Sequence, residues 1–245
     1  MTAIASTSSA GFSRMLAIIV AFALGVGIER TGLLEEILKY WPEIVYQSQA
    51  HIKLVLISGG LAVLVGVPFG VLLSRRAMRR VAEPIMQVLN VSTTIPTLAI
   101  LALAMTVMGI GERPAIFALW LHALLPIVRN SYEGVRSLPG HMIEAARGMG
   151  MRPRQVLLRV ELPNALPVIL AGIRTALVIN VGTVPLAFLI GGGGLGELIF
   201  SGIDLFEPAM MLAGAIPTGI LAVILDFLLG RLTVLVVPRG VTAMR

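Results

Sequence analysis

The chain has 245 residues, of which 57% are hydrophobic and only 13% are charged, and its mean hydropathy is +0.93. Because soluble domains usually carry about 25% charged residues, this composition excludes a water-soluble globular domain and an intrinsically disordered chain. The net charge of +6 does not indicate nucleic-acid binding, since the basic residues lie between apolar segments without the aromatic platform of single-strand binders.

Six apolar segments reach or approach the length of about 20 residues that a helix needs to cross the hydrocarbon core of a bilayer. They cover approximately residues 13–28, 51–73, 85–109, 114–130, 166–190 and 209–237. We interpret the first as a retained helix and not as a signal peptide, because no convincing small-residue cleavage site precedes Glu29. The predicted fold class is an all-α membrane protein with six transmembrane helices, forming a single domain over residues 1–245.

The connection between the first two spans, residues 29–50, predicts a short amphipathic helix at the membrane interface. Its apolar residues recur at helical spacing: Leu33, Leu34, Ile37, Leu38 and Trp41. Tyr40, Trp41 and Tyr46 suit the headgroup belt, where aromatic residues are enriched.

The distribution of Lys and Arg predicts that both termini are cytoplasmic, because cytoplasmic loops carry the excess of basic residues. With that topology four basic residues lie outside: Arg30, Lys39, Lys53 and Arg113. Arg174 lies within a span, and fourteen residues lie inside: Arg14, Arg75, Arg76, Arg79, Arg80, Arg129, Arg136, Arg147, Arg152, Arg154, Arg159, Arg231, Arg239 and Arg245.

The cytoplasmic connection of residues 131–163 predicts a compact knob of two short helices. Pro139 is placed to start the first, which runs to Gly148 or Gly150. Pro153 starts the second, which we expect to end before Pro163. The small residues Ala145 and Ala146 would keep one face of the knob thin enough to enter a groove on another protein.

The spacing within this connection resembles the EAA signature of permeases in bacterial ATP-binding-cassette (ABC) importers. Glu144-Ala145-Ala146 is followed after three residues by Gly150, after nine more by Val160, and then by Leu162-Pro163. Only Val160 departs from the family's pattern, which has Ile there. The resemblance implies a type I importer fold like that of methionine permeases and a location in the bacterial inner membrane. It also implies contact with an ATPase through Glu144, Ala145, Ala146, Arg147, Gly150, Val160, Leu162 and Pro163.

Longer stretches resemble the osmoprotectant permeases, which import glycine betaine, choline, carnitine or proline betaine. They are TTIPTLAILALAMTVMGIG, LLPIVRNSYEGVRSLP and LPVILAGIRTALVINVGTVPLAFLIGGGGLGELIFSGI, which together lie within residues 51–203. The resemblance implies a quaternary-amine cargo, an ATPase dimer, a second permease copy or paralogue, and a separate extracytoplasmic binding protein. Methionine permeases share the size and the GGGGLG turn, so transport of methionine or another small amino-acid-like solute stays as an alternative.

Several polar residues and one proline in the spans are candidates for the translocation path, because ionisable groups in hydrocarbon are costly. They are Asn90, Thr93, Thr94, Pro96, His122, Arg174, Asn180 and Asp226. Each has an alternative. Arg174 could bond helix carbonyls or extend to the interface, Asp226 could form an ion pair, and His122 could simply be packed. The uncharged residues could form interhelical hydrogen bonds. Pro96 could simply kink its span.

No set of residues predicts catalysis or a metal site, and the chain has no cysteine. The glycine run from Gly191 to Gly196 is not a phosphate-binding loop, because no Gly-Lys-Ser/Thr follows it. ATP and Mg²⁺ therefore belong to a partner ATPase. An ATP-independent channel or ion-coupled carrier, and a membrane receptor that transports nothing, are the rival hypotheses. Both leave the spaced signature unexplained.

Overall fold

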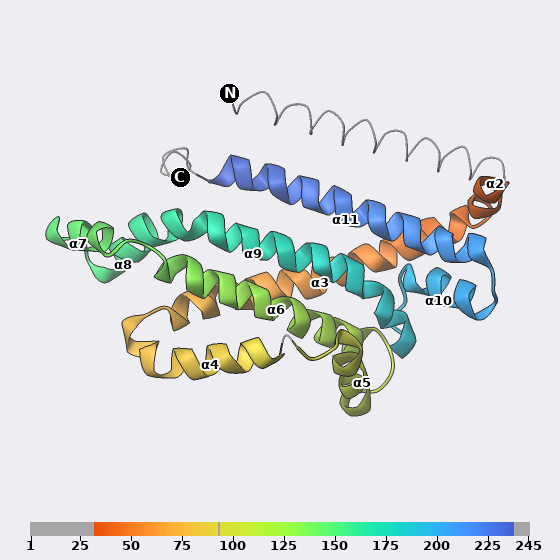
Figure 1. Ribbon diagram of the computed structural model, residues 1–245, viewed down its shortest axis with the longest axis horizontal. Helices are drawn as coiled ribbons and strands as arrows, with labels where there is room; N and C mark the ends of the chain where they lie inside the picture. The colour runs from red at the N-terminus through yellow and green to blue at the C-terminus, as the bar shows by residue number, and fades with distance from the viewer. Residues whose placement is uncertain (1–31, 93, 238–245) are drawn as a thin grey trace, which may run out of the picture.

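The computed structural model describes residues 32–92 and 94–237, which form helices joined by short turns, with no strand in these ranges. Long helices run side by side between two ends of the molecule (Figure 1). The short helices α7 (Gly140–Gly148) and α8 (Pro153–Val156) lie at one end, called here the α7 end. The helices α2 (Leu33–Leu38) and α10 (Gly196–Asp204) lie at the other, called here the α10 end.

Three helical stretches are long and apolar enough to cross a membrane: Trp41–Leu73 (α3), Pro153–Ile190 and Pro208–Val236 (α11). The second combines α8, a π-helical turn η2 (Leu157–Glu161), α9 (Leu162–Thr183) and a 3₁₀ segment η3 (Val184–Ile190). The predicted fourth span lies within α6, a helix of 25 residues from Glu112 to Arg136. The predicted first span, residues 13–28, lies outside the described residues.

The second span begins earlier than predicted. A short helix at residues 33–38 agrees with the expected interfacial segment, but α3 already starts at Trp41, ten residues before the predicted boundary at 51. Pro42 in the first turn favours this start. Gln47, in the segment predicted to lie at the interface, and His51, at the predicted boundary, are both buried.

The prediction of one continuous third span over 85–109 is wrong. After a 3₁₀ turn (Arg76–Met78), α4 covers Arg79–Ser92, and α5 begins only at Thr97 and ends at Met108. Pro96 lies at the N-cap of α5 and restricts the preceding residue to extended backbone. With 12 residues, α5 is about 18 Å long and cannot cross a bilayer alone.

The prediction that the second knob helix ends before Pro163 is also wrong. The helix that begins at Pro153 passes through Leu162 and Pro163 directly into α9. Because proline lacks an N–H and its ring meets the carbonyl of residue i−4, a helix must open to admit it. The π turn over 157–161 lies immediately before Pro163 and provides that opening. The knob is therefore continuous with a membrane helix.

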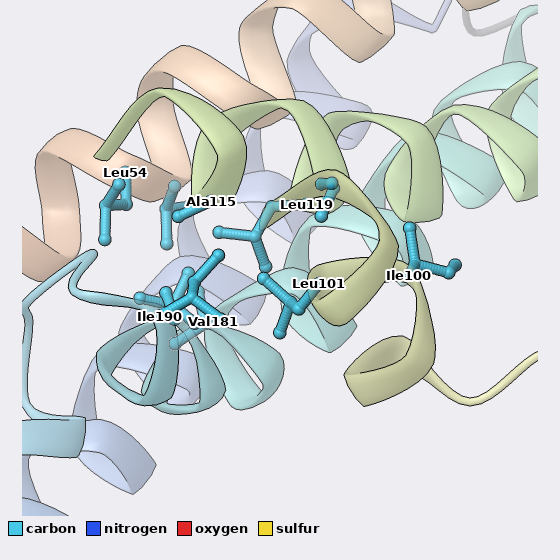
Figure 2. Close-up of a cluster of buried hydrophobic side chains, with 12 residues drawn as sticks. Leu54, Ile100, Leu101, Ala115, Leu119, Val181 and Ile190 are labelled. Atoms are coloured by element: carbon cyan, nitrogen blue, oxygen red, sulfur yellow. The ribbon is translucent and has the colours of Figure 1, made fainter. Parts of the chain in front are cut away.

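The largest buried cluster joins α3, α5, α6, α9 and η3 (Figure 2). Leu54, Leu101 and Leu119 are at most 1% exposed at its centre. Elsewhere α6 packs against α3 and α9 through glycines. A Cβ on Gly70 would lie 2.4 Å from the carbonyl oxygen of Val128, and one on Gly172 would lie 2.3 Å from Cβ of Asn130. These contacts require glycine and hold α6 at the centre of the bundle.

Basic residues gather at the α7 end, where α3 and α6 end and α4 begins. They include Arg75, Arg76, Arg79, Arg80, Arg136, Arg147, Arg152 and Arg154. The structure thus places at one end these eight of the fourteen basic residues that the sequence assigned to the cytoplasmic side.

Candidate coupling and translocation sites

The knob at the α7 end is built around a tight glycine turn. Gly150 has a φ of +78°, which only glycine adopts readily. Its N–H donates to the carbonyl of Arg147, and the N–H of Met151 donates to the carbonyl of Ala146. These bonds close the end of α7 in the manner of a Schellman cap. The predicted end of the first knob helix at Gly148 or Gly150 is therefore confirmed.

The two small residues of the signature have different surroundings. Ala146 is 1% exposed and packs inside the knob, so little of its side chain is available for contact with another protein. It packs there because α7 folds back onto the helix that leads into α9. Ala145, Glu144 and Arg147 are exposed. Val160, Leu162 and Pro163 are half-buried on the second helix.

An ion pair ties the knob to the neighbouring membrane helix. Glu161, buried in the π turn, accepts a hydrogen bond from Nη1 of Arg75 at 2.5 Å, just after the end of α3. Sequence reasoning missed this pair, although an acidic residue between apolar Val160 and Leu162 in a basic loop was a usable signal. The knob is therefore connected to two membrane helices. Its second helix continues into α9, and the Arg75–Glu161 ion pair links it to α3.

The polar residues predicted for the translocation path divide among three places. Asn90, Thr94 and Pro96 are exposed on α4 and the link to α5, while Thr93 lies outside the described residues. His122 on α6 is half-buried, and its Nδ1 lies 3.4 Å from Oγ1 of Thr97 at the start of α5. These residues share the side of the bundle formed by α4, α5 and α6 (Figure 1).

This side carries a trough. A polar cleft of about 370 Å³ between α4 and α6 is lined by Asn90, Arg129, Asn130 and Glu133, together with Leu89, Leu125 and Pro126. An apolar groove of about 580 Å³ adjoins it, shares Leu89 and Leu125, and extends along α5. We call the two together the α4–α6 trough. The sequence analysis did not identify Arg129, Asn130 and Glu133 as candidate path residues, although their spacing places them on adjacent turns of one helix.

Arg174 and Asp226 lie away from the trough. Arg174 on α9 donates from Nε and Nη2 to the two carboxylate oxygens of Asp226 on α11, each at 2.5 Å. The alternative of an interhelical ion pair for Asp226 is confirmed, and its partner is Arg174. Gly230 leaves room for the guanidinium, since a Cβ there would lie 3.3 Å from Nη1. The pair fastens α11 to the bundle.

Asn180 is buried between α9 and α3 and not in the trough. Its Nδ2 donates to Oγ of Ser58 at 2.8 Å, and that hydroxyl donates to the carbonyl of Leu54. This is the interhelical hydrogen bonding offered as the alternative to a polar lining. His51 is buried beside it, with Nε2 3.1 Å from the carbonyl oxygen of Val181.

The glycine run forms a tight turn at the α10 end, as expected. Gly191, Gly193 and Gly194 all have positive φ. Gln47 on α3 holds the turn, since its Oε1 accepts the N–H of Gly194 at 3.1 Å and its Nε2 donates to Glu197 on α10. Within the described ranges no group of three His, Cys, Asp or Glu side chains could hold a metal ion.

Comparison with known proteins agrees with these features. The osmoprotectant import permease OsmY of Salmonella typhimurium is 50% identical over 220 residues, covering 89% of this chain and 91% of that one. The choline transport permease OpuBB of Bacillus subtilis is 42% identical, covering 83% and 93%. The carnitine transport permease OpuCB of Listeria monocytogenes is 42% identical, covering 82% and 92%.

Solved structures show the same fold. An inward-facing form of the MetNI methionine ABC transporter superposes with a TM-score of 0.72 at 25% identity, covering 80% of this chain and 96% of that one. An amino acid ABC transporter crystallised with histidines gives a TM-score of 0.62 at 18% identity, covering 81% and 94%. The predicted fold class, an all-α permease of the type I importer kind, is confirmed.

Residues 66–240, which include the knob, the trough and most of the long helices, match one family over this whole range. The chain belongs to the family described as binding-protein-dependent transport system inner membrane component.

Proposed function

We propose that this chain is the permease of an ABC importer for quaternary-amine osmoprotectants such as glycine betaine, choline, carnitine or proline betaine. The observation that carries the proposal is similarity of 39–50% identity, over at least 82% of the chain, to permeases named for osmoprotectants, choline, glycine betaine or carnitine. A trough with amide and apolar groups suits a cation or zwitterion whose methyl groups need apolar contact.

In this proposal the α7 end is cytoplasmic, because basic residues gather there. The exposed residues Glu144, Ala145 and Arg147 contact a cytoplasmic ATPase dimer, which binds ATP and Mg²⁺ and hydrolyses the ATP. Ala145 is the small residue that permits close approach, since Ala146 already packs within the knob. A separate binding protein delivers solute at the α10 end.

Movement of the ATPases would reach the membrane through the continuous helix that begins at Pro153. A continuous helix transmits displacement along its axis, whereas a loop would absorb it. The Arg75–Glu161 pair adds α3 to the moving unit. The solute path would form where the α4–α6 trough of one permease faces a second permease copy or paralogue, since the trough is open in the single chain.

The test is uptake of labelled glycine betaine, choline and methionine into vesicles that contain this chain with its cognate ATPase and binding protein. ATP-dependent, saturable uptake of betaine or choline is the expected result. Uptake of methionine alone would overturn the substrate class. Flux without ATP would favour the channel or carrier.

The chain offers a matched pair of variants for the coupling step. Gly148 and Gly150 are both exposed, and a Cβ on either meets nothing within 4 Å. Gly150→Ala must hold alanine at a φ of +78°, at a cost of about 1–2 kcal/mol. Gly148→Ala replaces a helical glycine and does not have this cost. Uptake should therefore fall in the first and not in the second. Equal uptake by both would count against a required knob geometry.

A further inference from the structure

The turn between α10 and α11 presents an aromatic side chain in an unusual way. Phe206 is 92% exposed, the largest exposed fraction among the large hydrophobic residues of the described chain. It is also the one non-glycine residue there with a positive φ, at 55°. A bulky residue rarely adopts this backbone conformation, and the surrounding structure must enforce it. Leu205 and Ile203 beside it are 65% and 48% exposed.

The turn is held rigidly. The N–H of Glu207 donates to the carbonyl of Gly202 at 2.8 Å, and the N–H of Leu205 donates to the carbonyl of Ser201 at 2.9 Å. Gly202 lies against the first turn of α11, where a Cβ would lie 2.4 Å from the backbone nitrogen of Met211. The apolar tip is therefore fixed before any partner arrives, which lowers the ordering cost of binding.

The tip stands at or beyond the membrane boundary. From Pro208 to Arg231 α11 rises about 35 Å at 1.5 Å per residue, which exceeds a hydrocarbon core of about 30 Å. If Arg231 stays at one boundary, the start of α11 emerges from the other. Asp204 and Glu207 flank the tip and are exposed, which also places it outside hydrocarbon.

The surroundings of the tip are acidic. Tyr40 donates from its hydroxyl to Oε2 of Glu207 at 3.2 Å. Burial, and then the carboxylates of Glu207, Glu43 and Glu36, raise the pKa of that hydroxyl. Within residues 32–45 and 203–208 the exposed charged residues are five acids and one base: Glu35, Glu36, Glu43, Asp204, Glu207 and Lys39. Anionic headgroups would be repelled, so the charge favours a protein with a basic surface over a lipid surface.

We propose that Leu205 and Phe206 form a docking point for the extracytoplasmic binding protein, entering an apolar depression with a basic rim. This inference rests on the proposed function, which supplies the binding protein and its side of the membrane. An exposed, rigidly held aromatic residue with charges around it is the usual anatomy of an interface anchor. The carboxylates would steer association and set orientation.

The experiment measures binding of the cognate binding protein to the complete permease–ATPase complex in lipid nanodiscs. Phe206→Ala should weaken binding about tenfold or more, as expected for an anchor. Asp204→Asn with Glu207→Gln should reduce the association rate and its dependence on salt. Tyr46→Ala is the control, because Tyr46 is 70% exposed at the same end but belongs to α3 and not to the α10–α11 turn. It should bind as the wild type does.

The outcomes separate this inference from the proposed function. If the wild-type complex does not bind the cognate protein, the proposed function fails. If the wild type binds and Phe206→Ala binds equally, only the docking point is overturned. Phe206→Trp provides a second measurement. Quenching of its fluorescence by brominated phospholipid, undiminished by the binding protein, would show that the tip enters lipid and would overturn the inference. Protection from an aqueous quencher when the binding protein is added is the expected result.

Discussion

Two regions of the molecule contain proline where the sequence indicates a spanning helix, and they fold differently. The stretch Pro153–Ile190 stays helical through Pro163 and Pro167, whereas the chain breaks before Pro96 into α4 and α5. At Pro163 a π turn opens the helix, and Ile169 and Gly172 further along are buried. Around Pro96 the residues Thr94 and Ile95 are exposed and little packing opposes a break. Packing, and not proline alone, decides continuity.

The difference matters for the proposed mechanism. The continuous helix links the knob to the core and is suited to transmit force. The broken one borders the α4–α6 trough and is suited to change shape around a solute. The predictions below test this division.

The largest effect is expected from Gly150→Pro, which breaks the knob at the head of the continuous helix. Proline fixes φ near −65°, far from +78°, and removes the N–H that donates to Arg147. Uptake should be abolished while membrane insertion, measured by protease accessibility of the termini, stays normal. Transport at the wild-type rate would defeat the coupling role of the knob.

Glu161→Ala should reduce uptake strongly, because it leaves Arg75 without its partner beside the π turn. Loss of one partner of such a partly buried pair costs about 1–3 kcal/mol. Glu161→Gln should lose less, since the amide oxygen still accepts a hydrogen bond. Glu112→Ala is the control, because its pair with Lys53 is exposed at the opposite end. If both alanine variants transport equally well, the Arg75–Glu161 pair does not couple the knob to α3.

Asp226→Ala should have a smaller effect, mainly on stability, by releasing α11 from α9. The detergent-solubilised protein should lose secondary structure at a lower temperature than the wild type. Replacing Arg174 and Asp226 together by leucine should recover much of the loss, because two apolar side chains leave no charge unpaired. A double variant less stable than the single one would show that the pair does more than fasten two helices.

Pro96→Ala should have the smallest effect. The break before α5 persists because the extended backbone at residue 96 and the link to His122 through Thr97 do not require the proline ring. The free energy of unfolding should fall by about 0.4–1 kcal/mol, because alanine raises the conformational entropy of the unfolded chain. Abolition of uptake would mean that the break depends on Pro96 itself.

Much of this architecture could be predicted from the sequence. Four of the predicted apolar segments correspond to long helices, because hydropathy directly reflects burial in lipid. They are residues 51–73, 114–130, 166–190 and 209–237. The knob and the Gly150 turn followed from proline, glycine and spacing. What failed depended on tertiary contacts. The start of α3 was predicted too late, because the sequence does not show that the polar Gln47 accepts a hydrogen bond from the Gly194 turn. Ala146 faces its own chain, which spacing alone does not reveal.

The candidate path was less predictable, because a polar residue in a span can serve either a path or a neighbouring helix. Asn180 and Arg174 found partners on α3 and α11, respectively. Arg129 and Glu133 were assigned to a loop or its edge and instead border the trough.

The division between a continuous and a broken helix is tested most directly by distances between spin labels in the assembled transporter, with and without bound ATP. The chain has no cysteine, so labels can be placed at will. Leu158 and Ile179 are exposed on the continuous helix, and Val88 and Leu103 are exposed on α4 and α5. In mixtures with excess unlabelled permease, the distance from 158 to 179 should stay constant while that from 88 to 103 changes. A change within the first pair, with the second unchanged, would contradict the account.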